Sequence, residues 1–557
     1  MRVHLLLSIG FIAAPLVAQP PLKPEDLCRL EGRVLNAATG TPLSKATLTL
    51  MRNDAGAGMT SPPTNFTTST DAEGRFAMRD IEPGRYRLRA TRTGFVGIEY
   101  NARGPNRSGT MITLERGQQA KELNFRLPPH AVITGRVIDP DGEPMENAMI
   151  QLVRTTYVRG KKQMSPVNNI STNDLGEYRM FGVAPGKYFV SATYRGMYGM
   201  NNVDRSATPA PEEDFVPVWY PGTTDAAAAV QIDVAAGAQV SNINLKLAKA
   251  HTVHVRGRVT QSVATGRANT IVILLPRTGE GMALMMMMNR NRTVDAKGAF
   301  DIPSVAPGSY MLRASTSVGN KSYSASVPVD VGAASVENVV INIVPGAPLA
   351  GRLRPDREGS LALDNVRVQL MPRETATIYM NAGNAKVGED GGFRMDDVSP
   401  EQYNLSVYGL PDGYYVKTIR YGETDISSGA LDLPPGGSYA PLDIIVSPEA
   451  GQVSGGVQNP KTQQPAPGAM VVLIPQEPER RNQNSFYKTV TTDQLGNFTL
   501  KNLTPGQYKV FAWEDIEPGS YFDSEVVKPV EGSGEKVEVK PNGQHSVQLT
   551  LIPAGQA

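Results

Sequence analysis

Cysteine is almost missing from this chain of 557 residues, in which Cys28 stands alone. No internal disulfide can form, so each folded part must be held together by its own buried core. Aromatic residues are also scarce, at 6%, whereas glycine and proline number 54 and 43. Because Gly or Pro interrupts nearly every stretch in which a helical periodicity could run, the composition favours short strands joined by turns over long helices.

An excess of charge of one sign is absent too. The chain has 55 basic and 54 acidic residues, a net charge of +1, and no long run of either sign. Nucleic acids and anionic membranes bind concentrated basic surfaces, so neither is an expected partner. The length exceeds the roughly 250 to 300 residues that a single hydrophobic core normally serves, which predicts several domains.

The apolar run near the N-terminus is too short to cross a bilayer. It extends from Leu5 to Val17, follows the basic Arg2, and ends at Ala18 before a polar, Pro-rich stretch. A spanning helix needs about 20 residues. This order is typical of a secretory signal peptide, residues 1–18, cleaved near Ala18. We therefore expect a protein that is secreted, periplasmic or at the cell surface, without a membrane span.

A repeated pattern occurs five times along the chain. Each copy opens with a short apolar strand that contains a glycine, and a turn that ends in Gly followed by one residue and Phe or Tyr comes 40 to 42 residues later. The opening glycines are Gly32, Gly135, Gly257, Gly351 and Gly455, and the turn glycines are Gly74, Gly176, Gly298, Gly391 and Gly496. Nine residues after each turn glycine comes a proline, and a tyrosine follows three residues after that. The constant spacing predicts one structural unit per copy.

Apolar residues alternate with polar ones after each of these tyrosines, as in Tyr508, Val510 and Ala512. A period of two indicates a strand with one buried and one solvated face, and short strands separated by turns predict a two-sheet sandwich of roughly 100 residues per copy. We expect the repeated tyrosines to be buried, with the hydroxyl bonded to nearby backbone. They are Tyr86, Tyr188, Tyr310, Tyr403 and Tyr508.

The sequence resembles the carboxypeptidase regulatory-like family in its Gly-Arg-Val, Asp-x-x-Gly-x-Phe and Pro-Gly-x-Tyr segments, over residues 29–552. The resemblance implies an all-β chain of five tandem Greek-key antiparallel β-sandwiches, of the transthyretin-like kind and similar to the B-type repeats of collagen adhesins. After the signal peptide, the expected repeats are residues 29–128, 129–249, 250–346, 347–447 and 448–553. Short, partly stiff linkers such as Pro128-Pro129 and Ser447-Pro448 predict a semi-rigid rod.

The sequence contains none of the common catalytic motifs considered. His251 and His254 are close in sequence, but no acidic residue completes a zinc motif around them, and no nucleophile elbow or phosphate-binding loop occurs. The Asp of the repeated turn, as in Asp71, is replaced by Asn173 and Gly388 in two copies, which fits a turn-forming role. We expect no enzyme activity, no cofactor and no metal.

Binding is the expected function, with an extracellular or periplasmic polysaccharide or an envelope protein as the partner. The second copy carries an aromatic insertion, so Tyr198, Trp219 and Tyr220 are the candidate ligand-binding residues, together with Trp513 on the outward side of its strand. Two alternatives remain open. Trp219 and Tyr220 could cover the end of their own core, and the chain could be a passive spacer or an accessory scaffold for a separate enzyme or transporter.

Overall fold

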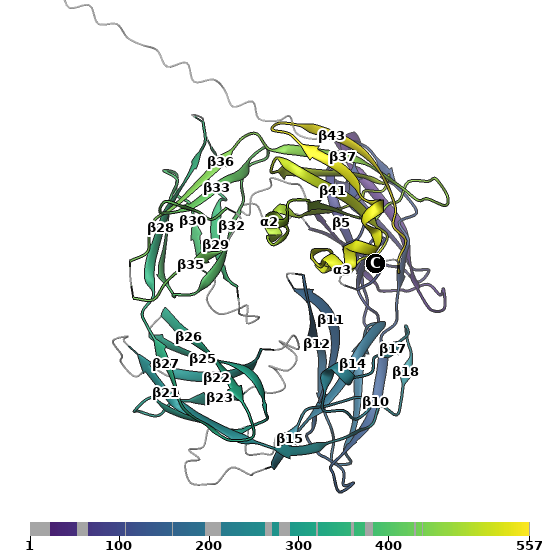
Figure 1. Cartoon of the computed structure of the whole chain (residues 1–557). Helices are drawn as coiled ribbons and strands as arrows, with labels where there is room; N and C mark the ends of the chain where they lie inside the picture. The colour runs from purple at the N-terminus through teal and green to yellow at the C-terminus, as the bar shows by residue number, and fades with distance from the viewer. Residues whose placement is uncertain are drawn as a thin grey trace, which may run out of the picture.

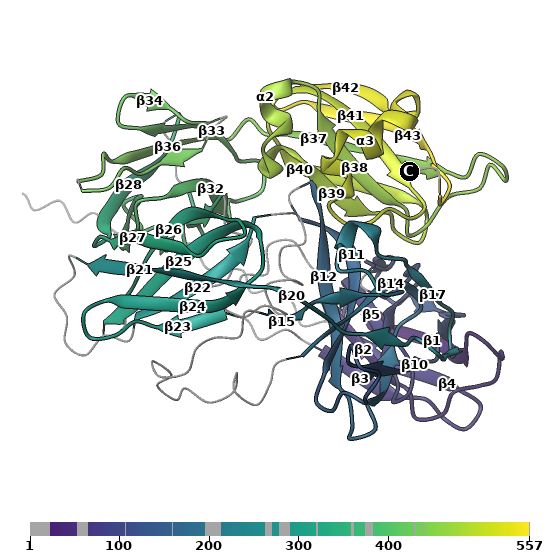
Figure 2. The ribbon, with the colours of Figure 1, turned by 60° about the horizontal axis from the view of Figure 1, so that its bottom comes forward.

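The chain folds into sandwich-like pairs of β-sheets that follow one another in tandem (Figures 1 and 2). The structure is a computed structural model that describes residues 23–52, 65–105, 107–158, 160–194, 213–261, 270–277, 290–318, 321–357, 361–373, 383–427, 430–436 and 438–555. The predicted signal peptide lies outside these residues. Among them, no helix has the length and apolar character needed to cross a membrane.

The strands group into sandwiches in the order of the chain. The first contains β1 (Cys28–Asn36), β2 (Thr47–Arg52), β3 (Asn65–Ser69), β4 (Arg75–Ile81), β5 (Gly84–Thr91), β6 (Ile98–Glu99), β7 (Ile112–Leu114), β8 (Gln119–Ala120) and β9 (Phe125–Leu127). The second contains β10 (Ala131–Ile138), β11 (Met149–Val158), β12 (Lys161–Ser171), β13 (Glu177–Val183), β14 (Gly186–Thr193), β15 (Glu213–Val216), β16 (Val218–Trp219), β17 (Ile232–Val234), β18 (Gln239–Val240), β19 (Leu245–Lys246) and β20 (Ala248–His251). The third contains β21 (Val253–Gln261), β22 (Thr270–Pro276), β23 (Arg290–Thr293), β24 (Ala299–Val305), β25 (Gly308–Val318), β26 (Lys321–Val331) and β27 (Val336–Ile343).

The fourth sandwich contains β28 (Ala347–Pro355), β29 (Arg367–Pro372), β30 (Asn384–Lys386), β31 (Gly392–Val398), β32 (Gln402–Tyr408), β33 (Tyr415–Tyr421), β34 (Thr424–Asp425), β35 (Leu431–Asp432) and β36 (Leu442–Ser447). The last contains β37 (Gly451–Gln458), β38 (Met470–Pro475), β39 (Lys488–Thr491), β40 (Asn497–Leu503), β41 (Gly506–Trp513), β42 (Glu535–Val539) and β43 (Gln544–Thr550). The helical turns are short: η1 (Pro24–Asp26), η3 (Ala226–Ala228), α2 (Pro478–Arg481), η4 (Asn484–Phe486), η5 (Ser520–Phe522), α3 (Ser524–Val527) and η6 (Lys528–Ser533).

The two sheets of the last sandwich show the common plan. One sheet has the order β40-β37-β43 and the other β39-β38-β41-β42. The opening strand β37 is antiparallel to β40 but parallel to the closing strand β43. Parallel pairing of the opening strand with a later strand recurs in the other sandwiches, so the expectation of purely antiparallel sheets is wrong. The first and last strands share one sheet and run the same way, because the chain between them crosses to the second sheet and back.

The repeated opening glycine is explained by this parallel neighbour. A Cβ added at Gly455 would overlap the carbonyl oxygen of Val547 on the closing strand. The residue opposite Gly455 on β40 is the repeated aromatic, Phe498. Only a residue without a side chain lets the closing strand come this close, so the glycine and the aromatic of the repeat belong to one packing arrangement.

The turn before each aromatic is held by its own side chain. In the last sandwich the Oδ1 atom of Asp493 accepts hydrogen bonds from the backbone N–H groups of Leu495, at 2.9 Å, and Asn497, at 2.8 Å. Asn173 makes the same pair of bonds in the second sandwich. Gly496 closes the turn with a φ of +76°, a region that favours glycine. The acidic residue is therefore a turn-former here, consistent with its replacement by Asn.

Each sandwich has an apolar core between its two sheets. The last sandwich has a second cluster on the outer side of the β38–β41 sheet, where Val472, Phe511 and Trp513 are covered by the segment that contains η5, α3 and η6. The apolar cluster of the third sandwich continues across the boundary and includes Val153 and Trp219 of the second. Neighbouring sandwiches are therefore joined by side chains as well as by linkers.

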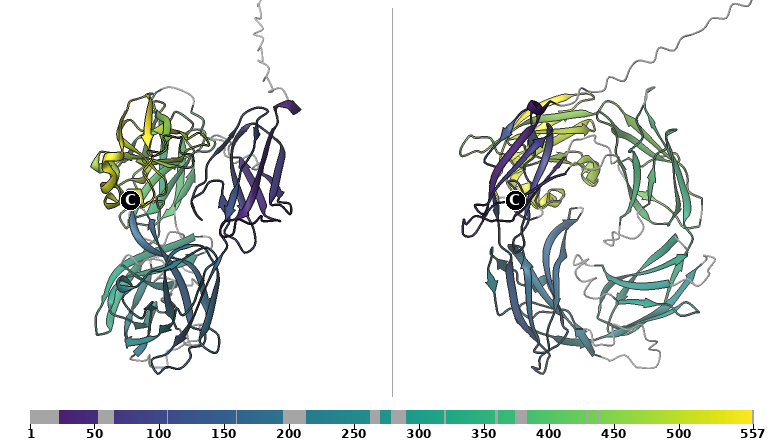
Figure 3. Two further views of the ribbon diagram at one scale, coloured as in Figure 1. Left: turned by 90° about the vertical axis from the view of Figure 1, so that its right-hand side faces the viewer. Right: turned by 180° about the vertical axis from the view of Figure 1, so that it is seen from behind.

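The arrangement of the sandwiches is closed, and the predicted rod is wrong. In Figure 1 the second, third, fourth and last sandwiches follow one another around a ring. The first sandwich lies beside the last (Figure 3). Ion pairs join Arg103 and Arg107 of the first sandwich to Glu514 and Asp515 of the last, at 3.0 and 2.9 Å. Linker stiffness alone could not predict this, because the direction of each linker decides whether a row of domains is straight or curved.

A long hairpin of the second sandwich completes the closure. Strands β11 and β12 have 10 and 11 residues, whereas the corresponding β38 and β39 have 6 and 4. The hairpin reaches η5 of the last sandwich, where a Cβ on Gly160 would lie 2.7 Å from the Cβ of Phe522. The extra length thus spans the distance between two sandwiches that are far apart in the sequence.

Candidate functional site

The aromatic insertion of the second sandwich is packed into the structure. Trp219 lies on β16, next to β14, and is 1% exposed. Its indole belongs to the apolar cluster shared with the third sandwich, together with Val153 and Ala226. A ligand could not reach this ring without movement of the groups that cover it, so in this conformation Trp219 joins two sandwiches.

The other aromatics of the insertion are less deeply placed. Tyr220 is half-buried against the core of the second sandwich. Phe215 packs edge-on against Tyr194, with ring centroids 5.3 Å apart, and the ammonium of Lys249 lies 5.2 Å from the Phe215 centroid. Tyr198 lies outside the described residues. Of the predicted ligand-binding residues with a described position, Tyr220 alone keeps a solvent-accessible part of any size.

Trp513 occupies the outward side of β41, as the alternation predicts, but it is 0% exposed. The segment after β41 folds back over this face, so Ile516, Val527 and Val530 bury the indole. Phe511 stacks on it with ring centroids 5.1 Å apart. The indole Nε1 has no hydrogen-bond partner among the described residues. Trp513 is therefore part of a second core, and no periodic pattern in the sequence predicts the short helices that cover it.

The repeated tyrosines form one structural motif. Each is buried, and its hydroxyl donates a hydrogen bond to the carbonyl oxygen four residues earlier, on the residue before the repeated proline. The distances are 2.8 Å for Tyr86 to Glu82, 2.8 Å for Tyr188 to Ala184, 2.9 Å for Tyr310 to Ala306, 2.9 Å for Tyr403 to Ser399 and 2.8 Å for Tyr508 to Thr504. Burial raises the pKa of Tyr508 to about 12. The motif ties the turn to the strand that follows it.

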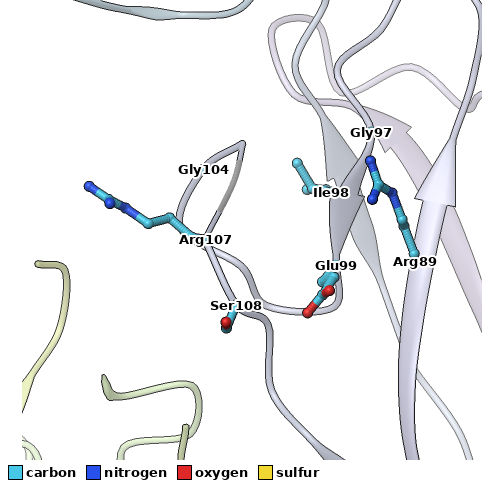
Figure 4. Close-up of a pocket in the computed structure, with 7 residues that line it drawn as sticks. All are labelled: Arg89, Gly97, Ile98, Glu99, Gly104, Arg107 and Ser108. Atoms are coloured by element: carbon cyan, nitrogen blue, oxygen red, sulfur yellow. The ribbon is translucent and has the colours of Figure 1, made fainter. Parts of the chain in front are cut away.

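A shallow polar pocket of about 200 Å³ lies in the first sandwich, between β6 and the nearby Gly104, Arg107 and Ser108 (Figure 4). Its charged side chains do not converge. Figure 4 shows Arg107 extending away from Arg89 and Glu99, and Arg107 is paired with Asp515 and Glu517 of the last sandwich. Glu99 accepts hydrogen bonds from Arg87 and from the backbone N–H of Gly109. The pocket contains Ser108 and Glu99, but the hydrogen bonds of Glu99 join it to Arg87 and Gly109 and do not assemble a nucleophile, base and orienting group.

Histidine and carboxylate groups do not assemble a metal site in the part of the chain that the structure describes, where no group of three or more potential ligands occurs. His254 Nδ1 is 2.6 Å from Asp301, and His251 Nε2 is 3.3 Å from the carbonyl oxygen of Ala333. The two histidines thus have separate partners. They lie on consecutive strands that belong to different sheets, β20 and β21.

Tandem two-sheet sandwiches with a buried tyrosine motif define the class of protein. The family model of the carboxypeptidase regulatory-like domain matches residues 29–128, 132–248 and 452–550, which is more than half of the chain. The chain belongs to the carboxypeptidase regulatory-like domain family, with three matched copies. The first predicted repeat has the same bounds as the first match. The matched residues do not include the third and fourth sandwiches.

Solved structures with related sheets are distant. The TIE protein of Bacillus anthracis has 11% identity and a TM-score of 0.17, covering 75% of this chain and 73% of its own. The minor pilin of Streptococcus agalactiae has 11% identity and a TM-score of 0.23, covering 40% and 96%. The major pilin subunit of Bacillus cereus has 10% identity and a TM-score of 0.14, covering 95% and 100%. No curated protein sequence matches the chain.

Proposed function

We propose that this protein is a non-catalytic binding and scaffold protein that works outside the cytoplasm. The observation that supports this most is that its tryptophans and the charged side chains of its polar pocket are engaged in contacts within the chain. Both tryptophans are buried in apolar clusters, and Arg107 and Glu99 of the polar pocket are engaged with other parts of the chain. Such a molecule offers a shaped surface and no assembled reaction centre in its described residues. The basic, apolar and small-residue order of residues 1–18 supports export.

The proposal includes the division into five independently folding domains with the bounds predicted from the repeat. The support is that each sandwich has a core between its two sheets, that of the third being shared in part with the second, and its own copy of the tyrosine motif. The surfaces that bind a partner would then be built from several domains held in fixed relation by the closed arrangement.

Carbohydrate binding is a second proposal, centred on the end of the second sandwich. It is supported by the half-buried Tyr220 and by the aromatic composition of the neighbouring segment, which includes Tyr198. Tyrosine rings pack against the apolar faces of sugars, and loops at a sandwich end are the usual place for such contacts. Trp219 and Trp513 would contribute indirectly, by holding the segment and the sheet in place.

One experiment separates the two proposals. Purified protein is mixed with insoluble envelope polysaccharide and, separately, with immobilised envelope proteins, and the retained fraction is measured. Polysaccharide retention that is lost on replacing Tyr220 and Tyr198 by Ala, but kept in Tyr408→Ala, would support carbohydrate binding. Tyr408 is a fair control because it is 55% exposed on the fourth sandwich. Retention by envelope protein alone would support the scaffold, and no retention by either would contradict both.

A further inference from the structure

Three arginines from two sandwiches face three carboxylates of the last one. Arg103 and Arg107 come from the loop after β6 of the first sandwich, and Arg154 comes from β11 of the second. Their partners are Glu514, Asp515 and Glu517, which lie between β41 and η5. Oppositely charged side chains therefore face one another where the last sandwich contacts the first two.

Glu517 is shared by both neighbours. One carboxylate oxygen is 2.8 Å from Arg107 of the first sandwich, and the other is 3.1 Å from Arg154 of the second. The side chains of these three residues are 20% to 28% exposed. A network of several partly exposed charges contributes more than an isolated surface pair, and salt still screens it. One side chain therefore joins three sandwiches.

Gln494 makes a second contact at the same junction. Its Nε2 donates to the carbonyl oxygen of Thr113 at 3.1 Å, and the backbone N–H of Thr113 donates to its Oε1 at 3.3 Å. The amide thus satisfies both backbone groups of Thr113 on β7, whose one neighbour within the described part of its sheet is β5. Leu495 beside it stays 65% exposed, so this part of the contact is polar.

In the other four copies of the repeat, the position that corresponds to Gln494 is occupied by a different residue type. The corresponding residues are Ala72, Asp174, Ala296 and Glu389. None of them has a side chain that can both donate and accept hydrogen bonds as an amide does. The contact with β7 is therefore a feature of the last sandwich and does not follow from the common fold.

We propose that this junction is a salt-sensitive latch. In the closed form the carboxylates of residues 514–517 and the amide of Gln494 hold the last sandwich against the first two. When salt screens the charges, the last sandwich separates from the first, and the backbone of Thr113 is uncovered.

Hydrogen exchange of the peptide that covers residues 111–114 reads the latch directly, because the Thr113 N–H bonds to Gln494 only in the closed form. The full chain is compared at about 0.05 M and about 1 M NaCl, where the screening length falls to about 3 Å. We expect exchange to rise about tenfold at high salt, the change expected for loss of several pairs in one network. Glu517→Gln removes two of the four ion pairs, so it should raise exchange at low salt by a smaller factor than high salt does.

Glu525→Gln is the matched control, because Glu525 is an exposed acidic residue of the same segment that lies outside the ion pairs of these arginines. It should behave as the unmodified protein does. Charge exchange gives an independent check: Arg103→Glu and Glu514→Arg should each speed exchange, and the two together should restore protection. Unchanged exchange in peptides of β5 and β41, central strands of the first and last sandwiches, shows that the sandwiches carrying the substitutions are folded.

Two results would overturn the latch. Exchange at residues 111–114 that is insensitive to salt and equal in Glu517→Gln and the unmodified chain would show that the charges do not hold the junction. Protection that falls when the protein is diluted at low salt would show that the contact forms between two copies and not within one chain. Salt-dependent exchange that does not depend on protein concentration supports the proposal.

Discussion

Replacement of Tyr508 by Ala should destabilise the last sandwich and leave the others folded. The ring is 1% exposed, lies in the core between the two sheets, and its hydroxyl donates to the carbonyl oxygen of Thr504. Removal of a large buried aromatic costs about 3 to 5 kcal/mol. Tyr508→Phe keeps the ring and loses only the hydrogen bond, so about 0.5 to 1.5 kcal/mol is expected.

Calorimetry of the full chain measures both effects. For a domain of this size, 1 kcal/mol corresponds to about 4 to 8 °C in Tm, so Tyr508→Ala should move one transition down by roughly 12 to 40 °C. Tyr408→Ala is the control, because an exposed side chain should change stability by no more than about 0.5 kcal/mol. If Tyr508→Ala shifted every transition together, the sandwiches would not fold independently. A shift as small as that of Tyr408→Ala would refute the core role of the ring.

Three further outcomes follow from the structure. Gly455→Ala should destabilise the chain in urea by about 1 to 3 kcal/mol or more, because its Cβ meets the carbonyl of Val547, whereas Gly532→Ala, with open space around it, should not. Trp219→Ala should cost about 3 to 5 kcal/mol in the same assay, and a change below about 1 kcal/mol would contradict its burial. Burial raises the pKa of Tyr508 to about 12, above the ordinary value of about 10. The stabilisation that comes from burying the neutral phenol should therefore be fully present below about pH 10 and fall as the pH rises toward 12. Tyr508→Phe should weaken that fall in the free energy of unfolding measured at several pH values.

The repeat predicts the local structure of each sandwich well, because its signals are local. Gly496 marks a turn with positive φ, and the alternation after Tyr508 identifies the buried face of β41. The parallel pairing of β37 with β43 is different. A period of two tells which residues share a face, but it does not tell which strand lies alongside or in which direction it runs.

The candidate site is harder to predict for a similar reason. Alternation places Trp513 on the outward side of its strand, and the structure agrees, yet residues 516–530 cover that side. Trp219 is covered by a neighbouring sandwich. In both cases burial depends on a segment or a domain beyond the sheet, and strand periodicity carries no information about it. The contacts of Gln494 and Glu517 likewise depend on how the sandwiches are oriented, which short linkers do not specify.

Small-angle scattering of the full chain in dilute, low-salt solution tests the central claim, that the tandem sandwiches close on themselves. A domain of about 100 residues has a radius of gyration of about 13 Å, so the tandem sandwiches in a straight row would give about 45 Å or more for the chain. The closed arrangement predicts about 35 Å or less, with no dependence on protein concentration. A value of about 45 Å or more at low salt would contradict the closed arrangement.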